Sequence, residues 1–454
     1  MRRIVRKGAL HNPEESPRDD EIAAGSAIAV RNDAVRRTTT ATLGEALYHA
    51  ALVVGRVIEG QSLAAGLLAG IPAEVRPQAQ DLVYGVLRRH GEGEALLAPL
   101  LRNPPSPAVR GLLFAALHRL HTWPEAPHTV VHQAVEAAAR LEGGCKGLVN
   151  GVLRNYMRRK AELEAACHER PESWAARLWH PEWWLRRLQA DHPKDWRAIV
   201  AAGNQPPPMA LRVNLRHGSA AEYLARLEVR GMAGALRGEA GILLAKPVPV
   251  DVLPGFFAGD VSVQDLGAQR AAELLAPKTG SAVLDACAAP GGKAAHLLER
   301  YDDLALTALD NDPARLARLE ETFARLRLAA RVCQADARQP WTGEPALFDA
   351  ILADVPCTAS GVARRHPDSK WLRMPQDVRK FAAMQQQILA RLWPTLKPGG
   401  KLLYATCSVF SEEDSAQVER FLRRFPEARL VTEEEWLPDA EHDGFYYALL
   451  QKQA

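Results

Sequence analysis

The chain has few cysteines, and they form no pattern that would indicate a disulfide framework. Its 454 residues contain six, at positions 145, 167, 287, 333, 357 and 407. No two of them have the CxxC spacing of a zinc site. Because scattered free thiols suit a reducing compartment, we expect a cytoplasmic protein without a metal site.

Long apolar runs and a strong net charge are also missing. No run approaches the roughly 18 apolar residues of a membrane span, and the N-terminus has no signal-peptide core. The 57 basic and 54 acidic residues leave a net charge of only +3. We therefore expect no membrane partner, and any affinity for nucleic acid must come from local patches.

The length suggests about three domains of roughly 150 residues each. Residues 1–40 are basic and then acidic, which predicts a disordered tail. Residues 41–165 have apolar positions at helical spacing and proline-rich loops, which predict an all-α domain. Residues 166–254 form a small mixed linking domain, in which five tryptophans are more often packing residues than stacking platforms for bases. Residues 255–454 alternate strand and helix, which predicts an α/β domain with a doubly wound sheet.

A glycine turn joins a strand to a helix in VLDACAAPGGKAAHLLE, residues 283–299. The turn fits neither the GxGxxG pattern nor a P-loop, but it would let a ligand approach the backbone closely. The next three strands end at Asp310, Asp336 and Asp354. Since strand ends line the ligand crevice of an open α/β sheet, these residues together predict a nucleoside pocket, although each acid alone could be a turn or cap residue.

Two cysteines follow apolar runs near the C-terminus. Cys357 lies in DVPC and Cys407 in YATCS, each just past a predicted buried strand. Two thiols at one crevice indicate nucleophilic attack on an electrophilic carbon, with the second thiol in support. The alternative is that both are small buried hydrophobic residues.

These motifs resemble those of a known enzyme group. DACAAPGGK, DVPC and YATCS are similar to the motifs of S-adenosylmethionine-dependent RNA cytosine 5-methyltransferases, and most closely to the RsmB (Fmu/Sun) family, which acts on bacterial 16S ribosomal RNA. LVYGVLRRH and KGLVNGVLRN resemble that family's NusB-like helical domain. PPPMALRVN, VSVQDLGAQRAAELLAP and HDGFYYALL resemble its linking region, the entry to its catalytic domain and its last strand.

The resemblance implies an S-adenosyl-L-methionine cofactor, a monomer, and 16S ribosomal RNA rather than DNA as partner. The methylated cytosine of the family is conventionally numbered 967. The residues implied to hold the cofactor are Cys287, Ala288, Ala289, Pro290, Gly291, Gly292, Lys293, Asp310, Asp336 and Asp354.

The resemblance also implies roles for the two cysteines. Cytosine C5 is too poor a nucleophile to take a methyl group directly, so a thiolate must first add covalently to C6. Cys407 is implied to be that nucleophile, and Cys357 to assist removal of the C5 proton and release of the base. DNA cytosine methyltransferases use the Pro-Cys position instead, which here is Cys357. Asp354 would contact the cytosine N3 edge, and Lys293 would orient Asp354 or the cofactor carboxylate.

Three residues depart from the family pattern: Val355, Ala294 and Asn311 stand where alanine, threonine and an isoleucine-like residue are usual. None is a proposed catalytic group. Two other functions remain open from the sequence, a tRNA cytosine 5-methyltransferase and a noncatalytic NusB-like RNA-binding factor. Two basic clusters of the helical domain are either phosphate contacts or a solvated helix face: Arg88, Arg89 and His90, and Arg154, Arg158, Arg159 and Lys160.

Overall fold

The structure, a computed structural model, describes residues 4–6, 42–142, 144–169 and 174–453. The chain forms two compact units. The helical unit contains residues 11–205 and 363–374, and the sheet unit contains residues 1–10, 206–362 and 375–454. None of the helices in the described part of the chain has the length and apolar character needed to span a bilayer.

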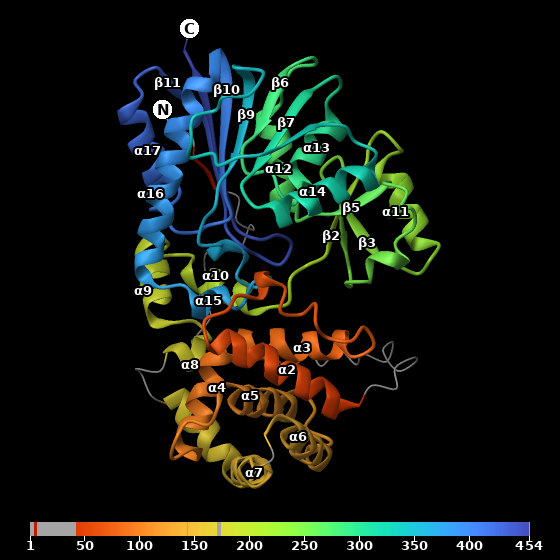
Figure 1. The fold of residues 1–454 in the computed structure, drawn as a ribbon, viewed down its shortest axis with the longest axis vertical. Helices are drawn as coiled ribbons and strands as arrows, with labels where there is room; N and C mark the ends of the chain where they lie inside the picture. The colour runs from red at the N-terminus through yellow and green to blue at the C-terminus, as the bar shows by residue number, and fades with distance from the viewer. Residues whose placement is uncertain (1–3, 7–41, 143, 170–173, 454) are drawn as a thin grey trace. The chain divides into compact units, whose positions relative to one another are not determined.

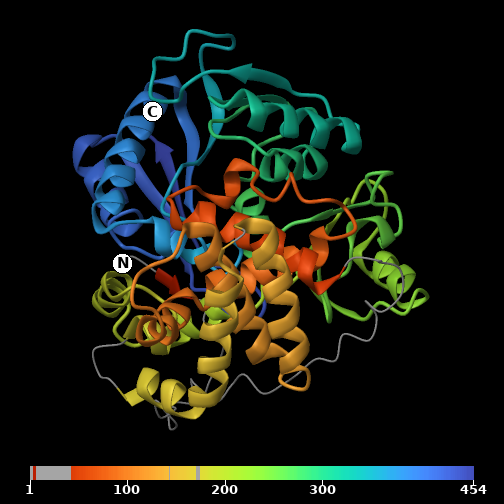
Figure 2. The same cartoon turned by 60° about the horizontal axis from the view of Figure 1, so that its bottom comes forward.

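The helical unit is built around α2, which packs against α3, α5 and α6 (Figure 2). Thr42 and Glu45 form a capping box that starts α2. Helices α2 and α5 approach each other closely at Gly111. A Cβ atom at this position would lie only 2.5 Å from the Ala51 carbonyl oxygen, so a larger residue would not fit. The helices of this unit are α2 (Leu43–Ile58), α3 (Arg76–Arg88), α4 (His90–Leu97), α5 (Pro107–Thr122), α6 (Pro127–Leu141), α7 (Lys146–Glu169), α8 (Trp174–Leu178), α9 (Glu182–Asp191), α10 (Trp196–Asn204) and α15 (Ser369–Leu372).

Four of the five tryptophans lie in helices α8 to α10, and Trp179 lies between α8 and α9. Their interpretation as packing residues is confirmed where they are buried. Trp184 and Trp196 are 1% and 8% exposed, and the rings of Trp174 and Trp196 stack with centroids 6.1 Å apart. Because these helices belong to the helical unit, the boundary between the units falls near residue 205, inside the expected linking domain of residues 166–254.

A short segment that follows the Pro-Cys motif also belongs to the helical unit. Within residues 363–374, Lys370 is fully buried. Its Nζ donates to the backbone carbonyl oxygens of Arg88 and Trp179 at 3.2 and 2.9 Å. Trp371 Nε1 donates to a backbone carbonyl at the end of α3, 2.7 Å away. The chain thus enters the helical unit five residues after Thr358 and returns to the sheet unit at residue 375.

The sheet unit begins with a small antiparallel sheet in the order β3-β4-β2-β5, with helix α11 (Ala220–Glu228) packed against β3 and β4. Its strands are β2 (Ala210–Val213), β3 (Gly234–Arg237), β4 (Gly241–Leu244) and β5 (Val261–Val263). Since β5 pairs with β2, this sheet extends past residue 254, where we expected the linking domain to end.

The large sheet has eight strands in the order β1-β11-β12-β10-β9-β6-β7-β8. The run from β10 to β8 is parallel, whereas β12 is antiparallel to both of its neighbours. The strands are β6 (Ala282–Asp285), β7 (Ala305–Asp310), β8 (Arg331–Gln334), β9 (Phe348–Asp354), β10 (Leu396–Thr406), β11 (Ala428–Trp436) and β12 (Phe445–Lys452). The predicted fold, a doubly wound α/β domain after an all-α domain, is confirmed.

Helices cover both faces of this sheet (Figure 1). One core contains Val283 with residues of α12, α13 and α14, and the other contains Leu284 with residues of α16 and α17. This alternation is what a strand buried on both faces requires. The helices are α12 (Leu266–Leu275), α13 (Gly292–Arg300), α14 (Pro313–Leu326), α16 (Pro375–Leu392) and α17 (Ser415–Arg424).

Part of the expected disordered tail takes part in the sheet. Residues Ile4–Arg6 form β1, which pairs in parallel with Glu433–Glu435 of β11. Backbone pairing at a sheet edge can order so short a segment, because an edge strand presents unpaired N–H and C=O groups. The rest of the expected tail lies outside the described residues.

Candidate active site

The site lies at the carboxyl edge of the parallel strands β6, β7, β9 and β10. Strand β6 has β7 on one side and β9 on the other, so the chain order reverses there and leaves a crevice outside the strand ends. In the register of the sheet, Asp354 at the end of β9 lies opposite Ala405 of β10. The two cysteine motifs therefore leave neighbouring strands at the same edge.

The glycine turn between β6 and α13 is held by hydrogen bonds to β7. The Ala288 N–H donates to the Leu309 carbonyl at 2.9 Å, and the Ala289 N–H donates to Asp310 Oδ2 at 3.2 Å. Gly291 has φ +98°, a left-handed conformation that favours glycine. Gly292 then begins α13.

The small antiparallel sheet contributes an arginine that fixes the start of α13. Arg212 of β2 is 1% exposed. Its Nη1 donates to the Gly292 carbonyl at 2.7 Å, and its Nε donates to Glu299 Oε2 at 2.9 Å. A buried charge pair with satisfied hydrogen bonds constrains geometry strongly. Arg212 thus holds both ends of α13 in place.

A cavity of about 80 Å³ opens beside the turn. Three of the predicted cofactor residues line it: Cys287, Asp310 and Asp336. The remaining lining residues come from the same strand ends and from α16, and only Asn311 among them was noted in the sequence: Ala286, Leu309, Asn311, Arg315, Ala335, Ala337, Arg338, Pro356, Met384 and Ile388. No local pattern in the sequence identifies Met384 and Ile388, since a helix residue reaches this wall only through tertiary packing.

The two acids of the cavity differ in their surroundings. Asp310 is 3% exposed, and besides the Ala289 N–H it accepts the Asp312 N–H at 3.1 Å. Asp336 is more open and forms an ion pair with Arg338 at 2.6 Å. This hydrogen-bonded pair lowers the pKa of Asp336.

Asp285 is a site residue that the sequence analysis missed. It ends β6 and is 1% exposed, and neither carboxyl oxygen has a hydrogen-bond partner among the described residues. Burial, and to a lesser extent the negative charge of Asp354, raises the pKa of Asp285 to about 8. The sequence does contain a signal for Asp285, because it is an acid at the end of an apolar strand, as Asp310 is.

Lys293 and Asp354 form a close pair across the edge of the sheet. Lys293 Nζ lies 2.6 Å from Asp354 Oδ2. Burial alone would lower the pKa of Lys293, but the Asp354 charge and hydrogen bond, together with the nearby Cys407 sulfur, raise it. The lysine is therefore a cation, directed at Asp354 and close to Cys407.

Cys357 and Cys407 come together, with their sulfur atoms 3.3 Å apart. The hydrogen bond with Cys407, followed by burial, raises the pKa of the Cys357 thiol well above its ordinary value. Since the thiolate is the reactive form, this rise disfavours ionisation of Cys357 in the free protein. The adjacent departure from the family pattern, Val355, is 4% exposed and donates its N–H to the Ala405 carbonyl.

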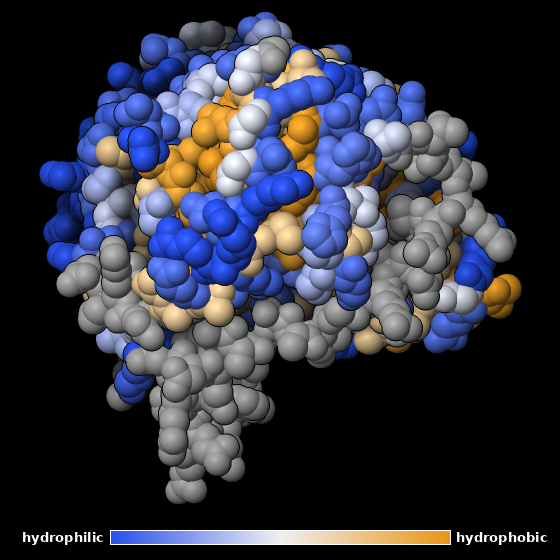
Figure 3. Space-filling view, turned by 90° about the horizontal axis from the view of Figure 1, so that it is seen from below, coloured by the Kyte–Doolittle hydropathy of each residue, from blue (hydrophilic) through white to orange (hydrophobic). Residues whose placement is uncertain are grey.

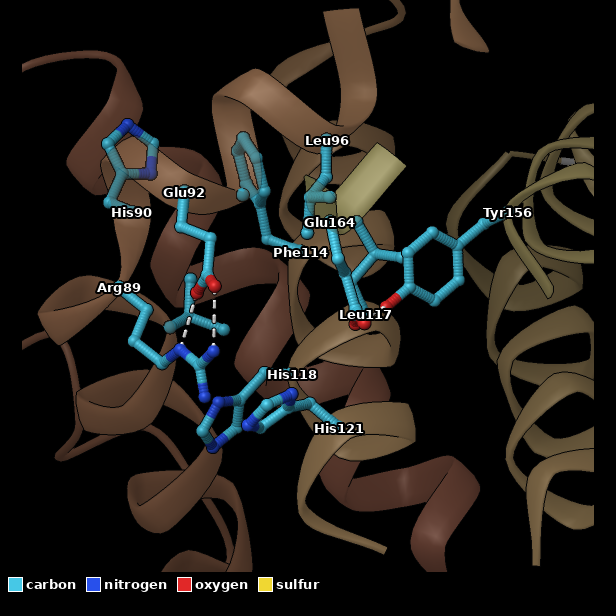
Figure 4. Close-up of a pocket in the computed structure, with 12 residues that line it drawn as sticks. Arg89, His90, Glu92, Leu96, Phe114, Leu117, His118, His121, Tyr156 and Glu164 are labelled. Carbon is cyan, nitrogen blue, oxygen red and sulfur yellow. Dashed lines mark hydrogen bonds and ion pairs between the residues drawn. The ribbon is translucent and has the colours of Figure 1, made fainter. Parts of the chain in front are cut away.

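The first basic cluster of the helical unit does not present free charges. Arg89 donates two hydrogen bonds to Glu92, at 2.5 and 2.8 Å, beside a cavity of about 30 Å³ (Figure 4). Burial lowers the pKa of His90 to about 4, so its ring is neutral near pH 7. Arg88 donates to the Arg364 carbonyl at 3.4 Å. These contacts occupy Arg88 and Arg89 within the unit, so the cluster offers less free positive charge than its sequence suggests.

The second cluster, on α7, is more open. Arg154 and Arg158 are exposed, whereas Arg159 pairs with Glu162 at 2.6 Å and Lys160 with a glutamate of the same helix. Seen from below, hydrophilic residues cover much of the surface around a central apolar area (Figure 3). Arg154 and Arg158 are thus the exposed members of this cluster that form no ion pair among the described residues, whereas the partly exposed Arg159 and Lys160 do.

Comparison with known proteins supports this description along most of the chain. The family described as 16S rRNA methyltransferase RsmB/F matches residues 272–451, a ferredoxin-like domain of RsmF/B-like methyltransferases matches residues 180–251, and the NusB family matches residues 52–158. Among solved structures, that of PH0851 aligns with a TM-score of 0.73 at 22% identity, over 91% of this chain and all of that one. The structure of NSun6 from Pyrococcus horikoshii aligns with a TM-score of 0.55 at 19% identity, over 60% of this chain and 98% of that one.

Relatives with higher identity align along most of the chain. Ribosomal RNA small subunit methyltransferase B from Vibrio cholerae is 43% identical over 87% of this chain and 94% of its own length. The protein of the same name from Cronobacter sakazakii is 42% identical over 89% of this chain and 97% of its own length. This identity extends over both units of the chain. It supports the same conclusion as the two adjacent cysteines at the carboxyl edge of the large sheet. The chain belongs to the ribosomal RNA small subunit methyltransferase B family.

Proposed function

We propose that this protein transfers a methyl group from S-adenosyl-L-methionine to C5 of a cytosine in 16S ribosomal RNA, at the family position numbered 967, through a covalent adduct between Cys407 and C6. The observation that carries the proposal is the pair of sulfur atoms 3.3 Å apart, next to the Lys293–Asp354 ion pair. Family membership makes the chain a ribosomal RNA methyltransferase. The methylated atom of the base and the covalent mechanism are what we propose beyond family membership.

The residues at the strand ends fit the methyl donor. S-adenosyl-L-methionine has a ribose diol and carries positive charge on its ammonium and sulfonium groups. Asp285, whose buried oxygens have no partner among the described residues, would hold the ammonium group, because a buried carboxylate needs a counter-charge. Asp310, with lone pairs left after its two N–H contacts and its ion pair with Arg315 at 3.3 Å, would accept the ribose hydroxyls. When bound, the donor supplies an electrophilic methyl group.

The reaction requires covalent help from the protein. Attack of the Cys407 thiolate on C6 forms a carbon–sulfur bond and turns C5 into an enamine-like nucleophile. C5 would then take the methyl group as the donor's sulfur–methyl bond breaks, which leaves the neutral thioether S-adenosyl-L-homocysteine. A base then removes the C5 proton, the C5–C6 double bond re-forms and the thiolate of Cys407 leaves. Each step uses a group already present at the carboxyl edge of β9 and β10.

The two thiols have different roles in this scheme. The raised pKa of Cys357 keeps its sulfur protonated, which disfavours it as nucleophile and lets its S–H stabilise the Cys407 thiolate. To act as base, Cys357 must first lose its own proton to solvent, and its raised pKa makes the resulting thiolate a strong base for the C5 proton. These properties support Cys407 as nucleophile and Cys357 as the group that assists proton removal and release.

The ion pair would stabilise charge on the base. During attack at C6, negative charge develops at N3 of cytosine, and a proton placed there lowers the barrier. Lys293 donates to Asp354 at 2.6 Å, so a proton of the Lys293 ammonium group can pass through Asp354 to N3, which leaves Asp354 a carboxylate and Lys293 a neutral amine. Lys293 also lies close enough to the Cys407 sulfur to stabilise its thiolate.

The target cytosine must leave its stack before the sulfur can reach C6. The exposed Arg154 and Arg158 on α7 are the residues we propose for phosphate contacts, and RNA binding should weaken as the salt concentration rises.

The two alternative functions have less support. A noncatalytic RNA-binding factor is disfavoured because the family match covers the methyltransferase domain. A transfer RNA methyltransferase is disfavoured because the relatives are named for ribosomal RNA.

The test is to map the product. The purified protein is incubated with the methyl donor and 16S ribosomal RNA from a strain without such an enzyme, and 5-methylcytosine is mapped by bisulfite sequencing. We expect one modified cytosine, absent with Cys407→Ala. Methylation at another atom of the base, or modification of transfer RNA alone, would overturn the proposal.

A further inference from the structure

A buried acid joins the two loops that carry the cysteines. Glu413, which precedes α17, is fully buried. Thr358 and Ser408 directly follow Cys357 and Cys407 in the chain, and both donate to this one carboxyl group. The acid therefore touches each loop one residue away from its sulfur.

Four donors converge on the Glu413 carboxyl group. Its Oε1 accepts the Thr358 N–H at 2.9 Å and the Gln385 side-chain N–H at 3.1 Å. Its Oε2 accepts the hydroxyls of Thr358 and Ser408 at 2.5 and 2.7 Å. Burial raises the pKa of Glu413 while these hydrogen bonds oppose the rise. A carboxylate, which only accepts hydrogen bonds, matches four donors with no group left unpaired.

Further contacts make the arrangement rigid. Gln385 of α16 also donates to the Pro356 carbonyl at 3.0 Å. The Tyr404 hydroxyl of β10 donates to the Glu413 carbonyl at 2.5 Å. The Gly361 N–H donates to the Cys407 carbonyl at 2.9 Å. Each cysteine loop is thus held on both sides of its sulfur.

We propose that Glu413 is a positioning residue that sets the spacing and orientation of Cys357 and Cys407. It does not touch the reacting atoms. It acts through Thr358 and Ser408, so that both sulfurs reach one cytosine in sequence. The catalytic part of this role rests on the function proposed above, whereas the geometric part does not depend on it.

Glutamine is the informative replacement. It has the same shape, but one acceptor oxygen becomes an NH₂ donor that faces groups already donating. The two hydroxyls can turn to accept, so Glu413→Gln keeps the fold while the loops shift. Glu419→Gln is the matched control, since Glu419 is an exposed acid of α17 that pairs with Arg423 at 3.8 Å.

The kinetic test measures kcat, KM and adduct together. A displacement of about 1 Å at a reacting group can cost on the order of a hundredfold in rate. For Glu413→Gln we therefore expect kcat to fall about tenfold to a hundredfold, with KM for RNA and cofactor affinity close to wild type. A covalent protein–RNA species should accumulate, because release needs Cys357 correctly placed. Glu419→Gln should match the wild type.

A second measurement reports sulfur proximity without RNA. Diamide oxidises two adjacent thiols: their hydrogens pass to its N=N bond, giving a hydrazine, and an S–S bond forms. In the wild type we expect rapid loss of two of the six thiols, absent in Cys357→Ser and slowed at least about tenfold in Glu413→Gln, since the rate depends on thiol access and geometry. Ser408→Ala, which removes one donor, should give an intermediate rate if Glu413→Gln does not fold.

The outcomes separate the two proposals. Unchanged diamide kinetics in Glu413→Gln and Ser408→Ala would overturn the positioning role, whatever happens to methylation. Slowed diamide kinetics in a protein whose wild type forms no 5-methylcytosine would support the positioning role and reject the proposed function. A fall in kcat with unchanged diamide kinetics would make Glu413 important for another reason and also reject the inference.

Discussion

Replacing Asp285 by asparagine should make the free protein more stable and at the same time weaken its binding of the methyl donor. Asp285 is 1% exposed and its carboxyl oxygens have no partner among the described residues. Burial raises its pKa from the usual 3.8 to about 8. Asparagine has nearly the same size and no charge, so the substitution removes the unfavourable ionised form.

The sign and size of the effect follow from the two pKa values. Between them the folded protein binds more protons than the unfolded chain, so stability falls as pH rises from about 4 to about 8. Since each pH unit corresponds to about 1.4 kcal/mol, the upper limit of the cost at neutral pH is roughly 4 kcal/mol. Relaxation and water entry reduce such penalties, and we expect a gain of about 1–3 kcal/mol, or several degrees in Tm.

Thermal unfolding with and without the methyl donor tests this prediction. Asp285→Asn should raise Tm at about pH 8, and the gain should shrink toward about pH 5. The methyl donor at a hundred times its Kd should raise the free energy of unfolding of the wild type by about 2–3 kcal/mol. The same donor concentration should stabilise the variant far less. Asp302→Asn, in an exposed pair with Arg216, is the control and should change stability by less than about 0.5 kcal/mol. Equal or lower stability of Asp285→Asn, with undiminished donor binding, would refute the reasoning.

Cys407→Ala should abolish both methylation and the covalent RNA adduct, whereas Cys357→Ala should form an adduct that persists on a denaturing gel; the opposite pattern would make Cys357 the nucleophile. Asp310→Ala should weaken donor binding by about tenfold or more in titration calorimetry, because the ribose would lose a buried acceptor, and unchanged affinity would reject that assignment. Lys370→Met should destabilise the protein by about 1–3 kcal/mol in urea unfolding, since buried carbonyl groups lose their donor. Arg158→Ala should reduce the salt dependence of RNA binding by about one unit of slope, and an unchanged slope would exclude this residue as a phosphate contact.

Much of the site could be predicted from the sequence, because its signals are local. A glycine turn after an apolar strand, acids at successive strand ends and two cysteines after buried strands all depend on neighbouring residues. Parallel strands bring their carboxyl ends to one edge, so the crevice follows once the strands are identified. Asp285 met the same criterion as Asp310, and the sequence analysis overlooked it.

Only the tertiary structure decided how the charges pair and where the units divide. The partners Arg212–Glu299 and Glu413–Thr358 lie 87 and 55 residues apart, a separation over which no local pattern specifies contact. For Lys293 the family resemblance offered two partners, and the structure pairs it with Asp354. Arg88, Arg89 and His90 form a basic cluster in sequence, but in the structure they are only partly exposed and have partners within the unit, because a helix face is defined by what lies against it. The sequence alone determined which chemistry the strand ends could perform. Packing determined which of these groups carry charge and which atoms they meet.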